Sequence, residues 1–378
     1  MTKQLDYLVL EAGSGFSKAH GFIKTTASCL ELVAQGYAPS TVNQGNVGRG
    51  IFTAINNLET DSSFGTETCE VFAGSSASSV LSVTFHGLDK VKTRQISECA
   101  TEGSGAVSKL VTFGDLSEYD IDDIEETNPD LIILVGEDCF SSDFKRDQLL
   151  TNALKLSAMD IGAPVVYYGN ASLKRPVENI FHRTGIEISF VEQKISDVSY
   201  SLLKKKLLES YVNKPLKIPG LNKLIAISNH NVINTLTGLF TSTLSFCKAK
   251  KICSALVLDF GASKVDAVRI TNALSDEYPE IDLISFAESP FTETKYLKLI
   301  DKIDFSNSLA LILTGGYFAE SNLNKSLFET VYKKYKALNS ISGLYIDKKY
   351  AFSALGNIGA VYPELALNTF ANWKADYD

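Results

Sequence analysis

The sequence lacks the residue spacings on which metal-binding proteins rely. No two of its six cysteines are separated as in a CxxC pair, and its four histidines form no HxH or HxxxH pattern. Zinc and iron–sulfur sites usually draw on such clustered ligands. We therefore predict neither kind of site, and we expect free thiols in a reducing compartment.

The chain also lacks a basic stripe and a long apolar run. Its formal net charge is −8, which argues against a nucleic acid partner. No apolar stretch approaches the roughly 20 residues that a membrane-spanning helix needs. The N-terminal residues show no secretory signal pattern. We expect a cytoplasmic protein that binds neither nucleic acid nor membrane.

The length and composition of the chain predict more than one folded domain. It has 378 residues, of which 45% are hydrophobic and 21% are charged, and this is ample for two hydrophobic cores. We predict an α/β fold with one domain over residues 1–213, containing an inserted α/β subdomain, and a second over 214–378. The last helix of the second domain could pack back on the first. A segment with two prolines and a glycine, residues 214–220, is the expected hinge.

Each half of the chain begins with three strands and continues with alternating helices and strands. The first three strands are expected at 5–12, 17–24 and 29–36, and the second three at 255–259, 264–270 and 281–287. Apolar strands at 130–135 and 163–168 flank a helix at 143–158, which predicts a parallel unit. We also expect a strand at 224–228, a helix at 231–246 with Asn229 as its N-cap, a strand at 308–314, and helices at 292–303, 321–338 and 349–360.

Two short stretches are built alike. Residues 8–15 and 256–263 each predict an apolar strand that ends in a carboxylate, Glu11 or Asp259, and then turns through small residues. Seven residues after each carboxylate comes a second charged group, Lys18 or Asp266. Small residues let backbone N–H groups approach phosphate oxygens closely. A strand-end carboxylate can hold hydrated Mg²⁺. The pair predicts two turns that clamp a nucleotide triphosphate from both sides.

The first turn is expected to hold the β-phosphate. The hydroxyl of Ser14 and the N–H groups of Gly13 and Gly15 would bind its oxygens, and Lys18 would offset its charge. Glu11 would contribute to the Mg²⁺ site. We expect no nucleophilic side chain, because positioning and charge stabilisation dominate phosphoryl transfer.

The second turn is expected to face the γ-phosphate. Asp259 would orient Mg²⁺ through water, and Asp266 would position the attacking water or a cation. The small residues of this turn are Gly261, Ala262 and Ser263. A third turn follows the apolar strand that ends at Thr314, where Gly315 and Gly316 permit close approach of a base or ribose.

At these three turns the chain resembles the superfamily of sugar kinases, heat-shock chaperones and actin. Residues 13–19 are similar to the first phosphate loop of actin, residues 259–266 to the second loop of Hsp70-type proteins, and residues 313–316 to the adenosine-binding turn. The resemblance implies two related ribonuclease H-like domains of the actin/Hsp70 type with a nucleotide cleft between them.

A closer resemblance covers nearly the whole chain. It is to the MutL-type (GlmL) accessory family of adenosylcobalamin-dependent glutamate mutase. The segments that carry it, in order, are Gly13-Ser14 with Ser17-Lys18, residues 38–42, 48–58, 75–77, 128–134 and 164–170, the Asp259 and Gly315 loops, and residues 343–350 with 354–356.

The family implies an ATP-binding, chaperone-like factor that protects or reactivates a cobalamin-dependent mutase, with ATP or ADP and Mg²⁺ as cofactors. The sequence departs from the family pattern at Glu11, where Asp is usual, at Ala262, which replaces a glycine, and at Lys264, which replaces a small hydroxyl residue. Two glycine-rich turns, after residues 77 and 135, are also lost. We expect a slow ATPase or a nucleotide binder that does not hydrolyse ATP.

Two other functions are compatible with the same turns. An actin-like protein that self-associates into dimers or filaments is favoured by the first loop and the chain length. A small-molecule kinase is the third hypothesis, although no sugar-kinase signature is present.

Overall fold

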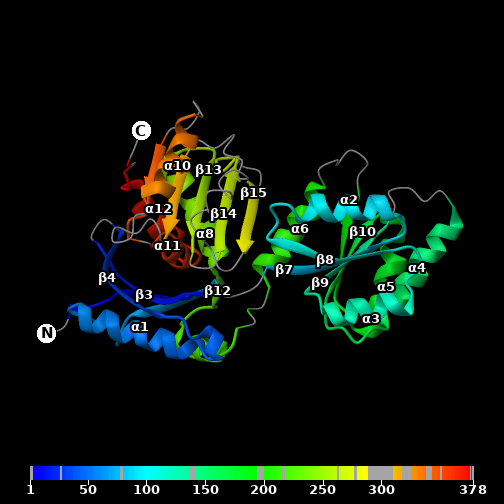
Figure 1. Cartoon of the computed structure of the whole chain (residues 1–378), viewed down its shortest axis with the longest axis horizontal. Coiled ribbons are helices and arrows are strands. Elements are labelled where there is room, and N and C mark those ends of the chain that lie inside the picture. The colour runs from blue at the N-terminus through cyan, green and yellow to red at the C-terminus, as the bar shows by residue number, and fades with distance from the viewer. Residues whose placement is uncertain are drawn as a thin grey trace. The chain divides into compact units, whose positions relative to one another are not determined.

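The computed structural model divides the chain into two compact units, Met1–Ser78 with Pro215–Asp378, and Ser79–Lys214 (Figure 1). It describes all residues except 1–2, 26–27, 77–79, 137–141, 194–199, 215, 217, 262–263, 276–278, 288–309, 317–324, 338–342, 350, 375 and 377–378. The second unit is therefore inserted into the first. The predicted boundary between residues 213 and 214 stays a prediction, and the helix expected at 292–303 lies outside the described residues.

The first unit contains two five-stranded sheets with the same strand order. In chain order the strands of one sheet are β2 (Tyr7–Ala12), β3 (Phe16–Lys24), β4 (Leu30–Pro39), β6 (Glu70–Ser75) and β12 (Ile233–Asn234). Those of the other are β13 (Ala255–Phe260), β14 (Lys264–Thr271), β15 (Glu280–Ala287), β16 (Ala310–Gly315) and β17 (Gly343–Ile346).

The two sheets follow one plan. In each, the third, second, first, fourth and fifth strands lie side by side in that order. The first three strands are antiparallel neighbours, and the fourth runs parallel to the first and to the fifth. This arrangement, found twice, confirms the predicted pair of related α/β domains. A separate parallel pair joins β1 (Lys3–Gln4) to β5 (Phe64–Gly65).

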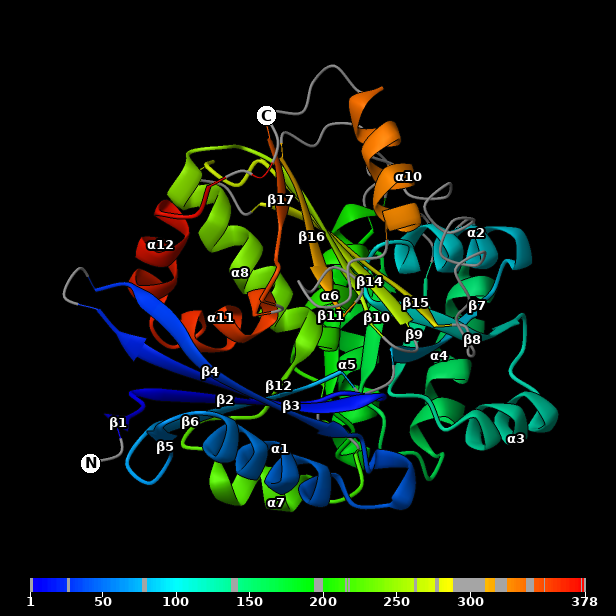
Figure 2. The same cartoon turned by 60° about the vertical axis from the view of Figure 1, so that its left-hand side comes forward.

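Helices cover both faces of the first sheet (Figure 2). Leu8 and Leu10 of β2 pack in one core with Ile51 of α1 (Val47–Asp61) and Leu224 of α7 (Leu221–Ile227). On the opposite face, Val9 packs in a core shared with α11 (Phe352–Gly359) and α12 (Pro363–Ala371). Because both faces are covered, β2 is an unbroken apolar run up to its carboxylate.

The other α-helices in the described part of this unit are α8 (Thr235–Lys250), which packs on β13 and β14, and α10 (Lys325–Lys336). The helices α10 and α11 confirm two predicted elements. The last helix, α12, also reaches the first sheet, where the hydroxyl of Thr369 accepts a hydrogen bond from Leu30 N at 2.8 Å.

The strand predicted at 224–228 is wrong, because α7 occupies Leu221–Ile227. This stretch is too short to show the helical repeat of apolar residues in the sequence. The structure shows which side of the helix is buried, because Leu224 is buried while Ile225 is 56% exposed. Asn229 does not cap α8; the side chain of Asn234 does, by accepting from Leu236 N. Asn229 instead bonds to both backbone groups of Val71 and so extends the start of β6.

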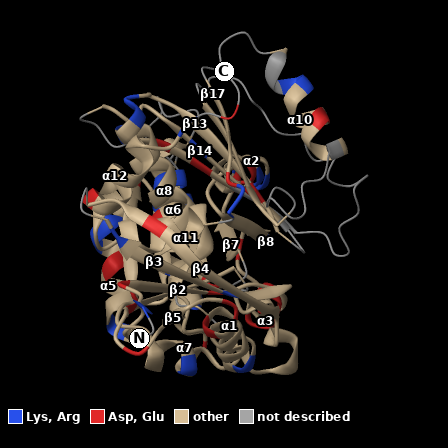
Figure 3. Cartoon of the chain, turned by 90° about the vertical axis from the view of Figure 1, so that its left-hand side faces the viewer, with Lys and Arg blue, Asp and Glu red and all other residues tan. Residues whose placement is uncertain are grey.

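The inserted unit is a five-stranded parallel sheet. Its strands are β7 (Leu81–Gly87), β8 (Ala106–Phe113), β9 (Leu131–Val135), β10 (Val165–Gly169) and β11 (Ile188–Glu192), in the spatial order β8-β7-β9-β10-β11. Its helices are α2 (Lys90–Thr101), α3 (Glu118–Thr127), α4 (Asp143–Ser157), α5 (Lys174–Thr184) and α6 (Ser201–Val212). The predicted parallel unit is confirmed, and α3 carries a dense row of acidic residues (Figure 3).

A buried ion pair lies where the two chain ends of the inserted unit meet. Lys214, its last residue, places Nζ 2.7 Å from Asp130 Oδ2 and donates to the carbonyl of Val80 at 3.0 Å. Asp130 Oδ2 also accepts from Ser82 N at 2.9 Å. The first strand and the last residue of the unit are thus held together.

Replacing Lys214 with methionine is expected to destabilise the inserted unit by about 3 kcal/mol, because Asp130 would keep a buried charge without its cation. Hydrogen exchange of residues 79–214 in the full chain measures this effect. Lys174→Met is the matched control, since Lys174 lies 3.9 Å from Glu178 and its side chain is 46% exposed. Equal protection in the two variants would contradict the prediction.

Two sequence expectations concern thiols and membranes. The five cysteines that the structure describes are free. Among the described residues, no helix has the length and apolar character needed to cross a bilayer.

Candidate functional site

The spacing between each carboxylate and the charged residue that follows it has a simple geometric origin. Across β2 and β3, Glu11 lies opposite Lys18, and across β13 and β14, Asp259 lies opposite Asp266. The two pairs occupy equivalent positions, since each carboxylate is on the first strand of its sheet and its partner on the second. The structure therefore brings each predicted carboxylate next to its spaced charge.

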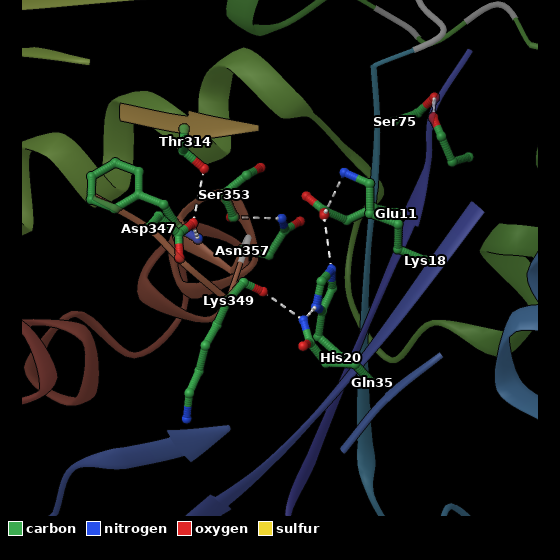
Figure 4. Close-up of polar contacts among 12 residues, drawn as sticks. Glu11, Lys18, His20, Gln35, Ser75, Thr314, Asp347, Lys349, Ser353 and Asn357 are labelled. Atoms are coloured by element: carbon green, nitrogen blue, oxygen red, sulfur yellow. Dashed lines mark hydrogen bonds and ion pairs between the residues drawn. The ribbon is translucent and has the colours of Figure 1, made fainter. Parts of the chain in front are cut away.

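Glu11 lies in a buried cluster of polar side chains (Figure 4). Its Oε2 is 3.6 Å from Lys18 Nζ and 3.2 Å from His20 Nε2. Burial alone raises the pKa of Glu11, but the charge of Lys18 and the hydrogen bond from His20 outweigh it and lower the pKa from 4.5 to about 2. Its Oε1 has no hydrogen-bond partner within 3.5 Å among the described residues, but the side chain of Ser353 lies close enough to lower the pKa further. The carboxylate is thus ionised.

The first small-residue turn is shaped by close backbone contacts. Gly13 N donates to Phe16 O at 2.9 Å, and a Cβ at Gly13 would lie 2.6 Å from that same oxygen. Ser40, which directly follows β4, fixes the turn, because its hydroxyl donates to Gly13 O at 2.6 Å and its N–H to Gly15 O at 2.9 Å. Only glycine fits at position 13. Ser14 and Gly15 remain partly exposed at the tip.

The second and third turns meet at Asp259. Both Asp259 and Asp266 are buried, and Gly315 pairs with Phe260 in the parallel ladder. Gly315 has φ +102°, and a Cβ there would lie 2.5 Å from Phe260 N and 2.7 Å from Asp259 Oδ1. The structure therefore brings the predicted third turn directly against the second carboxylate. Gly261 and Gly316 lie beside them, while Ala262 and Ser263 lie outside the described residues.

One acidic residue at this site was not singled out from the sequence. Asp347 follows β17 directly, whereas Glu11 and Asp259 are the second-last residues of their own strands. Its Oδ2 accepts from Thr314 Oγ1 at 2.8 Å and from Phe352 N, the first residue of α11, at 2.7 Å. Burial raises the pKa of Asp347, against the lowering effect of these hydrogen bonds. The position of Asp347 just after an apolar strand was the only indication of it in the sequence. Its hydrogen-bond partners could not be predicted, because they come from distant segments.

Two further residues extend the cluster around Glu11. The side chain of His20 is buried, and its Nδ1 lies 3.0 Å from Gln35 Nε2, which also donates to the carbonyl of Lys349 at 2.7 Å. Neither residue was predicted, because the register of β3 and β4 and the distant turn at Lys349 decide their contacts.

The residues fit a hydrated Mg²⁺ better than a fully protein-ligated metal. No group of three or more His, Cys, Asp or Glu with metal-binding geometry occurs among the described residues. Mg²⁺ commonly keeps several waters and takes only one or two carboxylates plus phosphate oxygens. The buried carboxylate of Glu11 meets that requirement, and so does the buried carboxylate of Asp259 near the end of β13. Both are strand-end oxygens beside a small-residue turn.

Comparison with solved structures finds low overall similarity. A nucleotide-free acetone carboxylase matches with 11% identity and a TM-score of 0.32, covering 75% of this chain and 48% of its own. A ligand-bound xylulose kinase from Lactobacillus acidophilus matches with 8% identity and a TM-score of 0.38, covering 99% of this chain and 93% of its own. At these scores the likeness carries no functional argument.

Comparison of sequences identifies the family. Protein MutL from Clostridium tetanomorphum is 21% identical over 301 residues, which cover 76% of this chain. The match spans only 62% of that relative's length. A family model described as MutL protein matches residues 7–294. Since that match covers most of the sequence, the chain belongs to the MutL protein family, as the ordered motifs predicted.

Proposed function

We propose that this protein binds ATP or ADP with Mg²⁺ and acts as an accessory, chaperone-like factor for an adenosylcobalamin-dependent glutamate mutase. The observation that carries the nucleotide part is the duplication: two sheets of one plan each place a buried carboxylate one residue before the end of their first strand, close to a small-residue turn. Membership of the MutL family supports the accessory part. The protein would be cytoplasmic and would need neither nucleic acid nor membrane.

The first turn would hold phosphate through backbone and side-chain donors. Gly15 would supply an N–H group, Ser14 a hydroxyl, and Lys18 a positive charge beside them. The N–H of Gly13, predicted as a further donor, is instead used within the turn, where it donates to Phe16 O at 2.9 Å. In the absence of phosphate, Glu11 would position Lys18, since Glu11 Oε2 lies 3.6 Å from Lys18 Nζ. The Glu11 carboxylate would contribute to the Mg²⁺ shell through water.

The second and third turns would hold the remainder of the nucleotide. Asp259 would bind the hydrated Mg²⁺, and Asp266, opposite it in the ladder, would orient a water or a cation. When bound, Mg²⁺ neutralises phosphate charge and orients the phosphate oxygens. The turn of Gly261, Ala262 and Ser263 would contact phosphate, and that of Gly315 and Gly316 the adenosine. The substitutions at Glu11, Ala262 and Lys264 favour slow or absent hydrolysis.

ATP with Mg²⁺ is expected to raise the melting temperature of the full chain, because a ligand bound only by the native state stabilises it by about 2.7 kcal/mol at 100 times its Kd. Asp259→Asn should abolish most of the rise, since it removes the Mg²⁺-binding charge. Asp160→Asn, at an exposed site, is the matched control and should keep it. An unchanged melting temperature with ATP, ADP and pyrophosphate alike would refute nucleotide binding.

The accessory role is tested with the mutase itself. A pull-down of purified glutamate mutase should recover different amounts with ATP and with ADP, because the two nucleotides would set different positions of the clamping turns. A nucleotide-dependent melting temperature without any capture of the mutase would remove the accessory role and leave the nucleotide site.

A further inference from the structure

The hydrogen bonds around His20 define one tautomer. Gln35 Nε2 donates to the carbonyl of Lys349, so its second N–H is directed at His20 Nδ1, 3.0 Å away. Because Nδ1 accepts, the proton of the neutral imidazole is on Nε2 and donates to Glu11 Oε2 at 3.2 Å. A continuous chain of hydrogen bonds therefore runs from the first carboxylate to the backbone of Lys349 (Figure 4).

A second chain of hydrogen bonds reaches the same turn from the other sheet. Asp347, two residues before Lys349, accepts from the hydroxyl of Thr314 at 2.8 Å. Thr314 immediately precedes Gly315, whose turn is expected to contact adenosine. Asp347 also accepts from Phe352 N and so fixes the start of α11. The next residue of that helix, Ser353, faces Glu11 closely enough to lower its pKa.

The turn that carries Asp347 and Lys349 thus contacts both predicted ends of the nucleotide site. One end is the Glu11–Lys18 turn, reached through Gln35 and His20. The other is the Gly315 turn, reached through Thr314. All of these residues belong to the first compact unit. A ligand at either end would restrict this shared turn further, and the second ligand would then lose less conformational entropy on binding.

We propose that the Asp347–Lys349 turn couples the two ends of the site, so that phosphate binding at the Glu11–Lys18 turn and adenosine binding at the Gly315 turn strengthen each other. This inference rests on the proposed nucleotide site and adds the contacts through which binding at one end affects binding at the other. Gln35 and Thr314 are positioning residues in this scheme, since they act through other groups. The coupling must be reciprocal, because it is a difference in binding free energy.

The experiment uses two halves of the nucleotide as separate probes on the full chain. Titration calorimetry measures the Kd of Mg²⁺–pyrophosphate alone and with saturating adenosine, and then the reverse. We expect each probe to tighten the other about 10-fold, within the usual range for coupled sites. The two factors should agree within error.

Two variants break the turn's contacts from opposite sides. Gln35→Leu removes the bonds to His20 and Lys349, and Thr314→Val removes the hydroxyl that Asp347 accepts. Each should reduce the factor to about 1, whereas Thr314→Ser, which keeps the hydroxyl, should restore it. Gln148→Leu is the matched control, because the side chain of Gln148 donates to the exposed Asp115 in the inserted unit, and this variant should keep the wild-type factor.

The outcomes separate the two proposals. Binding of both probes with no mutual effect in the wild-type protein overturns the coupling and leaves the nucleotide site intact. A wild-type factor that persists in both Gln35→Leu and Thr314→Val also overturns it. Failure of both probes and of ATP to bind refutes the proposed site itself.

Discussion

Alanine at position 356 is expected to destabilise the first unit by about 3 kcal/mol or more, because a backbone contact leaves no room for a methyl group. Gly356 lies on α11 where this helix crosses α8. A Cβ there would overlap the carbonyl oxygen of Gly238 and lie 2.6 Å from its carbonyl carbon and 2.8 Å from Ser242 Oγ. The backbone of a hydrogen-bonded helix cannot shift at one residue alone, so α11 would have to move as a whole.

Denaturant unfolding of the full chain measures the loss. Gly162→Ala is the matched control, since a Cβ at Gly162 meets no atom within 4 Å, and it should change stability by less than about 0.5 kcal/mol. Displacement of α11 would also move Ser353 away from Glu11, so the stabilisation by ATP should fall in Gly356→Ala. A variant as stable as Gly162→Ala would show that the two helices are not packed this closely.

The sequence predicts the parts of this fold that depend on neighbours along the chain. The β2–β3 and β13–β14 hairpins are local, so the sequence shows the seven-residue spacing of Glu11 from Lys18 and of Asp259 from Asp266. Only the register of the strands shows that the members of each pair face each other. Strands buried on both faces are unbroken apolar runs, and β9 and β10 were predicted for that reason.

Contacts between distant segments set the limit of sequence-based prediction. Gln35 meets Lys349, and Thr314 meets Asp347, only because separate strands bring them together. Asn229 illustrates the same limit. Asparagine is favoured at helix starts, but here its side chain accepts a hydrogen bond from Val71 N, far away in the sequence. The roles of Ala262 and Ser263 stay predictions, because those residues lie outside the described part of the chain.

Removal of the Lys18 charge is expected to cost about 3 to 5 kcal/mol of unfolding free energy, because it leaves the buried carboxylate of Glu11 without its cation. Glu11 is 3% exposed, and its Oε2 is 3.6 Å from Lys18 Nζ. Lys18→Met should therefore be severe. The double variant Glu11→Gln with Lys18→Met should recover much of the loss, since neither side chain then carries a buried charge. Lys24→Met, at an exposed site on the same strand, is the control.

The pH dependence of the same variants tests the electrostatic origin of this loss. In the folded protein the pKa of Glu11 is lowered from 4.5 to about 2. A lowered carboxyl pKa stabilises the folded state above the unfolded pKa, and this contribution, about 3 kcal/mol, disappears as the pH falls from 4.5 to 2. Urea unfolding at pH 7 and pH 3 should show a smaller pH dependence in Lys18→Met than in the wild-type protein, because the largest influence that lowers the pKa is gone. If Lys18→Met kept the wild-type pH dependence, or if the double variant were no more stable than Lys18→Met, the Lys18–Glu11 pair would not be the interaction that stabilises the first turn.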